Sequence, residues 1–155
     1  MTARSTEHAT FVIERAYDAS PARVFAAWAD KAAKARWFDG SDGLGGYELD
    51  FRVGGREVNR GGPPGGPVYT YEARYADIVP NQRIVYTYTM DCEDARISVS
   101  VTTVEFEAAG AGTQLTFTEQ SVFLEGADTP QIREHGTKEL LDGLGAALSG
   151  TPATA

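Results

Sequence analysis

The sequence predicts an α+β fold in which a curved antiparallel β-sheet wraps around one long C-terminal helix. Three observations lead to this expectation. Segments with a hydrophobic period of two fill the middle of the chain, two short helical segments separate the first strand from the others, and an apolar stripe at helical spacing runs through 130–148. A sheet wrapped around the helix is the economical way to bury that stripe. Such an arrangement commonly leaves a gap between sheet and helix, where we expect a functional site.

The N-terminal quarter of the chain predicts one strand and two short helices. Residues 10–18 are rich in Phe, Val, Ile and Tyr, which favour strands. Ser20 and Pro21 then match the N-cap and the first position of a helix, which we expect to run to Ala29. A second short helix is expected at about 31–37.

Six further strands are predicted after a glycine-rich loop at 41–46. Turn residues separate them, and their expected ranges are 47–53, 56–60, 68–78, 83–90, 96–106 and 113–123. In the fifth of these strands the apolar residues change faces, with Ile97, Val99 and Val101 on one face and Val104 and Phe106 on the other. A β-bulge near 102–103 would reconcile the two halves. The terminal helix presents a stripe formed by Thr137, Leu141, Leu144 and Leu148.

Two adjacent glycines, Gly54 and Gly55, predict a two-residue β-hairpin turn. Three cross-strand pairs would result: Val53 with Arg56, Arg52 with Glu57, and Phe51 with Val58. The polar residues around this turn are Asp50, Arg52, Glu57 and Asn59. They either form the solvent-exposed side of the hairpin or line a cavity and bind a polar part of a ligand, and the pattern leaves both alternatives open.

Composition sets limits on the class of protein. The 155 residues suffice for one domain, expected at 10–149 with flexible tails at 1–9 and 150–155. Fourteen Lys and Arg against 22 Asp and Glu give a net charge of −8, which disfavours nucleic acid or a membrane as the partner. Cys92 is the single cysteine, and no metal-ligand spacing or cofactor motif is present. Without a spanning segment or a secretory signal, we expect a cytoplasmic protein.

Several fragments, taken in order, resemble one known family. They are Arg15-x-Tyr17-x-Ala19-Ser20-Pro21-x-x-Val24-Phe25-x-x-Trp28, Trp37-Phe38, Asp50-x-Arg52-Val53-Gly54-Gly55-Arg56, Ile78-Val79-Pro80-x-x-Arg83-Ile84-Val85-Tyr86 and Gly136-x-x-x-Leu140-Leu141-x-x-Leu144. Over about 10–148 the chain resembles bacterial relatives of the C-terminal domain of the activator of the 90-kDa heat-shock-protein ATPase. That family belongs to the START-related (SRPBCC) helix-grip superfamily, together with polyketide cyclases.

The resemblance implies a helix-grip fold with a hydrophobic cavity, and a homodimer is one expectation drawn from relatives. It implies little about chemistry, because this fold hosts carriers, cyclases and chaperone partners. The chain departs from the family pattern at three places. Thr137 stands where tryptophan is frequent, Glu57 and Asn59 stand where aromatic residues are common, and the loop 60–67 is rich in Gly and Pro. That loop is either a flap over the cavity or a plain connector.

Eleven residues are candidates for binding a ligand, because they are aromatic or polar and are expected near the gap: Trp37, Phe38, Arg52, Glu57, Tyr71, Tyr86, Tyr88, Phe117, Glu119, Arg133 and Thr137. Glu119 is also the one candidate for a catalytic residue. It shares a strand face with Leu115 and Phe117, where desolvation would suit a carboxyl group to general acid–base catalysis; pairing with an arginine is the alternative. Arg133 is expected at the inner edge of the long helix, at the cavity mouth or extended to solvent.

Three functions follow as hypotheses. The first is binding of a small apolar or amphipathic molecule between the sheet and the terminal helix, without catalysis. The second is a cyclase- or dehydratase-like enzyme that uses Glu119 with tyrosine hydroxyls. The third is a module that contacts a chaperone. Neither His8 nor His135 is placed as a general base.

Overall fold

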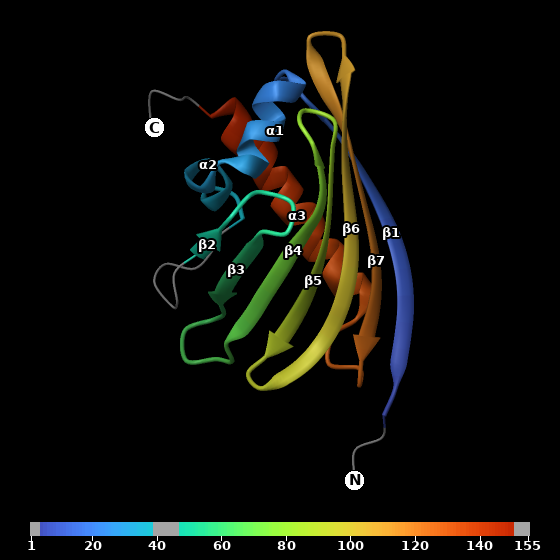
Figure 1. Cartoon of the computed structure of the whole chain (residues 1–155). Helices are drawn as coiled ribbons and strands as arrows, with labels where there is room; N and C mark the ends of the chain where they lie inside the picture. Colours follow the sequence, from blue (N-terminus) through green and yellow to red (C-terminus); the bar gives the residue numbers. More distant parts are fainter. Residues whose placement is uncertain (1–3, 39–46, 151–155) are drawn as a thin grey trace.

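The predicted element order is confirmed by the computed structural model, which describes residues 4–38 and 47–150. The elements are β1 (Thr6–Tyr17), α1 (Pro21–Ala29), α2 (Lys31–Ala35), β2 (Tyr47–Leu49), β3 (Arg56–Gly61), β4 (Tyr69–Val79), β5 (Arg83–Cys92), β6 (Ala95–Ala109), β7 (Gly112–Leu124) and α3 (Pro130–Ser149). The strands form one antiparallel sheet in the order β1-β7-β6-β5-β4-β3-β2. Figure 1 shows α3 lying against one face of the curved sheet, with α1 and α2 at one end. This is the predicted α+β helix-grip layout.

Each helix begins at a side chain that accepts a hydrogen bond from its first turn. Ser20 caps α1 as predicted, Asp30 caps α2 and Thr129 caps α3. The predicted stripe of α3 is buried against the sheet, and Arg133 is buried one turn before Thr137. The inner face of the sheet and this stripe therefore form one core.

The first strand begins earlier than predicted. β1 starts at Thr6, and its first residues pair with the end of β7, from Thr6 with Leu124 to Ala9 with Ser121. Residues 6–9 thus belong to the sheet rather than to a tail, because a long partner strand is available to a segment of polar composition. The predicted loop 41–46 and the tail after Gly150 lie outside the described residues.

The predicted register of the double-glycine hairpin is wrong by three residues. β2 pairs with β3 from Tyr47 with Asn59 to Leu49 with Glu57, so residues 50–55 form the connection. The register differs because the two glycines do not close a two-residue turn. They form backbone hydrogen bonds with β4 instead.

Two hydrogen bonds join this connection to β4. Gly54 N–H donates to the Tyr75 carbonyl at 2.8 Å, and Tyr75 N–H donates to the Gly55 carbonyl at 3.1 Å. Gly54 has φ +84°, and a Cβ on Gly55 would lie 2.0 Å from the Asp50 carbonyl oxygen. Both positions therefore require glycine, although not for the turn that the sequence predicts.

The predicted bulge near 102–103 is also absent from β6, which the structure describes in full. Its pairing with both neighbours is regular there. The register shift lies instead where Met90 pairs with Ser98 and Asp91 with Arg96, which leaves Ile97 of β6 without a partner in β5. From Ser98 onward, alternate residues of β6 therefore point to the same face of the sheet, and Ser98, Ser100 and Thr102 are buried on its inner face. Val99 and Val101 point outward, and each is 39% exposed. Polar side chains thus face the helix where the sequence predicts apolar ones.

Candidate functional site

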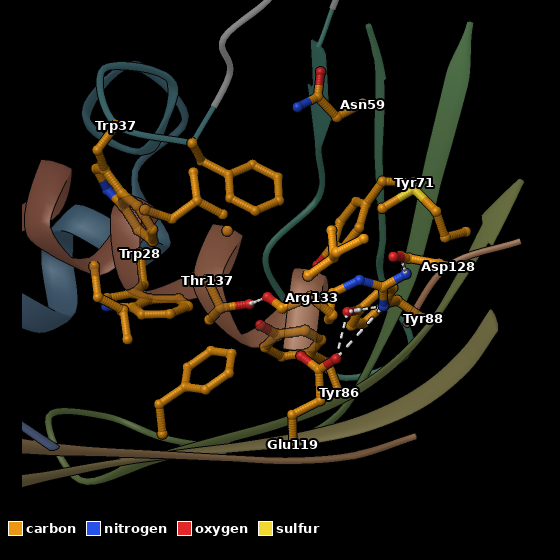
Figure 2. Close-up of a pocket in the computed structure, with 17 residues that line it drawn as sticks. Trp28, Trp37, Asn59, Tyr71, Tyr86, Tyr88, Glu119, Asp128, Arg133 and Thr137 are labelled. Carbon is orange, nitrogen blue, oxygen red and sulfur yellow. Dashed lines mark hydrogen bonds and ion pairs between the residues drawn. The ribbon is translucent and has the colours of Figure 1, made fainter. Parts of the chain in front are cut away.

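A cavity of about 310 Å³ lies between the inner face of the sheet and α3 (Figure 2). Its walls come from α1, the segment after α2, four strands, the turn before α3 and the first part of α3, as far as Leu141. The lining residues are Trp28, Trp37, Phe38, Asn59, Tyr71, Tyr86, Tyr88, Met90, Phe117, Glu119, Asp128, Ile132, Arg133, Gly136, Thr137, Leu140 and Leu141. Most of this wall is aromatic or aliphatic, and the polar side chains gather mainly where α3 begins.

Aromatic rings in mutual contact form one side of the cavity. The ring of Tyr71 lies 5.0 Å from that of Phe38 and 4.7 Å from that of Tyr88. Trp28 and Trp37 pack edge to face at 4.8 Å, and the Trp37 indole N–H donates to the Ala27 carbonyl at 3.0 Å. Contacts of this kind hold large side chains in one position at little entropic cost. The apolar part of the cavity is therefore shaped before any ligand enters.

Arg133 is the centre of the polar end. Its Nη1 donates to the Tyr88 hydroxyl at 2.8 Å, and its Nη2 donates to Ser98 and to Asp128, both at 2.9 Å. The Glu119 carboxylate lies 3.6 Å from Nη1. Figure 2 shows the guanidinium directed inward from α3 to Tyr88, Glu119 and Asp128. Since the residue is only 9% exposed, the alternative in which it extends to solvent is wrong.

Glu119 is 1% exposed and uses a single oxygen for all of its contacts within the described residues. Its Oε2 accepts from the Tyr88 hydroxyl at 2.7 Å, from Ser121 at 3.0 Å and from Ser100 at 3.5 Å, and it faces Arg133. Its Oε1 takes no hydrogen bond from that part of the chain. The carboxylate is thus held rigidly by one oxygen while the other stays available to a bound molecule.

The tyrosines of this site are protonated at neutral pH, and burial raises their pKa above the ordinary value near 10. Burial raises the pKa of Tyr88, and the neighbouring Glu119 charge raises it further. Burial likewise raises the pKa of Tyr71 and of Tyr86. Burial alone would lower the pKa of Arg133, but Tyr88, Glu119 and Asp128 more than compensate, so that its pKa is raised. The hydroxyls therefore act as neutral donors, and the guanidinium stays charged.

Three residues that line the cavity carry a buried polar atom without a partner among the described residues. These atoms are the indole N–H of Trp28, the hydroxyl of Tyr71, a residue that is 7% exposed, and Oδ1 of Asn59. A buried group left without a hydrogen bond costs about 1–3 kcal/mol. Such groups are usually satisfied by a ligand or by water.

A second polar cluster lies behind the aromatic wall and joins α2 to the sheet. Lys34 Nζ is 2.8 Å from a Glu57 carboxylate oxygen, and neither side chain is exposed. The hydroxyls of Tyr75 (2.6 Å) and Tyr47 donate to the same carboxylate. Lys34 Nζ also lies 4.4 Å from the ring centroid of Phe38. Burial lowers the pKa of Lys34, although Glu57 opposes the shift.

Nine of the eleven predicted binding residues line the cavity, and whether they bind a ligand stays a prediction. Arg52 and Glu57 do not line it. Arg52 is exposed and pairs with Asp50 at 2.9 Å, and Glu57 turns inward to Lys34 rather than to the cavity. Asp50 and Arg52 therefore form the solvent side of the hairpin, whereas Glu57 and Asn59 do not.

Sequence reasoning missed Asp128 and Lys34. Asp128 precedes the N-cap of α3 in a turn, and Lys34 lies in a five-residue helix without a clear apolar period. Neither residue stands in a local sequence pattern that would predict its position at the site. The loop 62–67 is exposed, and none of its residues lines the cavity. His135 is exposed and lies 3.6 Å from Glu139, away from the site.

Two further findings concern only the part of the chain that the structure describes. There, no three or more His, Cys, Asp or Glu residues are grouped so that they could hold a metal ion. None of the helices in that part is both long and apolar enough to cross a membrane.

Comparison with known proteins agrees with this architecture. The family described as Activator of Hsp90 ATPase homolog 1-like protein matches residues 18–149. A solved structure from Rhizobium leguminosarum is 48% identical over 97% of this chain and 100% of its own, with a TM-score of 0.91. One from Rhizobium loti is 49% identical over 93% of this chain and 99% of its own, with a TM-score of 0.88.

CalU16 from Micromonospora echinospora is 21% identical over 97% of this chain and 87% of its own, and its TM-score of 0.65 shows a shared fold alone. No curated protein matches the chain. The match over residues 18–149 covers most of the sequence, and the chain therefore belongs to the Activator of Hsp90 ATPase homolog 1-like family of the helix-grip superfamily.

Proposed function

We propose that the protein binds a small amphipathic molecule between the sheet and α3. The observation that carries the proposal is a cavity of about 310 Å³ with aromatic walls and a cluster of fixed polar groups at one end. Its volume is at the lower limit of ordinary ligand sites, which span roughly 300–1,000 Å³. The apolar body of the ligand would lie among the rings, and its polar group would meet the cluster around Arg133 and Glu119.

Thr137 supports this proposal because its small side chain leaves space where relatives often carry tryptophan. Its hydroxyl donates back to the Arg133 carbonyl at 2.8 Å, and the residue lines the cavity. The space is therefore not closed by a neighbouring ring. A collapsed core at this place would favour the chaperone-contact hypothesis instead, and the structure has a cavity there.

The experiment is binding of prodan, a neutral naphthalene whose fluorescence shifts to the blue in apolar surroundings, to the full chain. Thr137→Trp places an indole in the cavity, and we expect it to weaken binding at least tenfold. Glu139→Trp, on the exposed side of the same helix, is the matched control and should bind as the wild type does. Equal binding by all three proteins would place the probe elsewhere and reject the proposal.

The cyclase- or dehydratase-like alternative has one specific observation in its favour. One oxygen of the Glu119 carboxylate takes no hydrogen bond from the described residues, and the protonated Tyr88 hydroxyl donates to the other oxygen at 2.7 Å. A base and an acid thus lie together at the cavity. If a substrate is found, Glu119→Gln should abolish its turnover, and unchanged turnover would end this assignment. The chaperone contact, the homodimer and the cytoplasmic location remain predictions.

A further inference from the structure

The polar end of the cavity carries more negative than positive charge. Arg133 is its one cation among the described lining residues, and it faces two carboxylates, Asp128 at 2.9 Å and Glu119 at 3.6 Å. The formal sum of the three groups is −1. Lys34, behind the aromatic wall, is matched by Glu57 and adds no net charge.

Most donors of this cluster are already in use, whereas an acceptor is open. Three of the five N–H groups of Arg133 donate to protein atoms, at 2.8 Å to Tyr88 and at 2.9 Å to Ser98 and Asp128. Glu119 Oε1 is an acceptor without a hydrogen bond from the described residues, and Figure 2 shows Glu119 directed into the site from the sheet. An incoming carboxylate or phosphate would meet the like charges of Glu119 and Asp128 and displace existing hydrogen bonds. A ligand with a hydrogen-bond donor would instead bind the open oxygen of Glu119.

The walls beside this acceptor also suit a cation. The rings of Tyr71 and Tyr88 are 4.7 Å apart and both line the cavity. Aromatic faces attract ammonium groups, and the attraction grows when water is excluded. The unpartnered hydroxyl of Tyr71 can accept a hydrogen bond from the same head group.

From these contacts we infer that the ligand is an amphipathic amine, whose protonated amino group binds Glu119 Oε1 while its apolar body occupies the aromatic part of the cavity. The inference rests on the proposed function and adds the chemical class of the ligand. Glu119 is held by Oε2, so that the free oxygen is fixed in place before binding.

The test uses three probes with one naphthyl body: 2-(2-naphthyl)ethylamine, 2-(2-naphthyl)ethanol and 2-naphthylacetate, titrated calorimetrically into the full chain at neutral pH. We expect the amine to bind at least tenfold more tightly than the carboxylate, with the alcohol between them. Tighter binding of the carboxylate, or equal binding of the amine and the carboxylate, overturns the inference. If prodan binds, that result leaves the proposed function standing; if neither prodan nor any of the three binds, the proposed function itself fails.

Two variants separate a local effect from the overall charge of the protein. Glu119→Gln keeps the shape of the side chain and should reduce the preference for the amine over the carboxylate to threefold or less. Glu139→Gln removes the same charge from the exposed side of α3 and should leave the preference unchanged. If both variants reduce the preference for the amine over the carboxylate equally, the preference comes from the net charge of the protein, and the role of Glu119 is rejected. Should Glu119→Gln fail to fold, the wild-type probe series still decides the inference.

Discussion

Raising the pH should unfold this protein abruptly, because five buried tyrosines must stay protonated in the folded state. Burial is the main cause of the raised pKa in Tyr17, Tyr71, Tyr75, Tyr86 and Tyr88. In the unfolded chain each ionises near pH 10. Above that pH the unfolded state releases protons that the folded state retains, so stability is full below pH 10 and is lost as the pH rises further.

The magnitude follows from the number of protons. Each group contributes about 1.4 kcal/mol per pH unit above 10, so five groups contribute about 7 kcal/mol per unit. Domains of this kind have a free energy of unfolding of about 5–15 kcal/mol, which places the midpoint of unfolding near pH 11–12. The lowered pKa of Lys34 acts in the opposite sense, but only up to its ordinary value of 10.5.

The assay is absorbance at 295 nm, which reports tyrosinate, followed together with far-UV circular dichroism. Both signals should change in one steep transition. Tyr86→Phe removes one of the five protons and should lower the steepness by about a fifth. Tyr69→Phe is the control: Cys92 raises the pKa of Tyr69, but the residue is exposed, so that solvent screens the interaction and its ionisation costs the fold little. A gradual rise in absorbance centred on pH 10, with the dichroism unchanged, would refute the reasoning.

Three further changes test the energetics in urea unfolding. Lys34→Met leaves Glu57 buried without its cation and should cost about 3–5 kcal/mol; the double variant with Glu57→Leu should recover most of that loss, and no recovery would contradict the role of the pair. Gly55→Ala places a Cβ 2.0 Å from a backbone oxygen and should cost at least about 2 kcal/mol; a neutral result would show that this loop rearranges freely. Asp142→Ala breaks an ion pair with Arg15 in which Asp142 is 67% exposed and should cost less than about 1 kcal/mol; a larger loss would mean that the surface pair matters structurally.

The element order could be predicted from the sequence because its signals are local. Ser20 and Pro21 specify a helix start within two residues, and the stripe of α3 follows from its own spacing. The register of the first hairpin could not be predicted in this way. Gly54 and Gly55 satisfy a local rule for a tight turn, but their backbone hydrogen bonds go to Tyr75 of β4. A rule that considers only the turn and its two flanking strands cannot predict pairing with a further strand.

The candidate site shows the same limit. Aromatic residues on the inner face of a strand, such as Tyr86 and Tyr88, were predictable from alternation. Lys34 was not, because its burial depends on Glu57, which lies 23 residues further along the chain. A lysine on a short helix normally faces solvent, and only the folded arrangement of α2 over the sheet gives it a partner.

The error in β6 is the most informative one for function. A strand selected for stability alone would bury Val99 and Val101 on the same face as Val104 and Phe106, which is what a bulge near 102–103 implies. The structure instead buries Ser98 and Ser100 and leaves the valines exposed. Burying hydroxyls in place of methyl groups gains no hydrophobic stabilisation, and their hydrogen bonds must at least offset desolvation.

Those serines do form specific bonds, since Ser98 accepts from Arg133 at 2.9 Å and Ser100 contacts Glu119 Oε2 at 3.5 Å. Each serine therefore contacts one of the three charged groups at the polar end of the cavity. Replacing Ser100 by valine should then loosen Glu119 without enlarging the cavity, and the expected amine preference should weaken while prodan binding persists. Loss of both together would mean that Ser100 supports the fold in general, whereas loss of the preference alone would show that this serine of β6 positions Glu119.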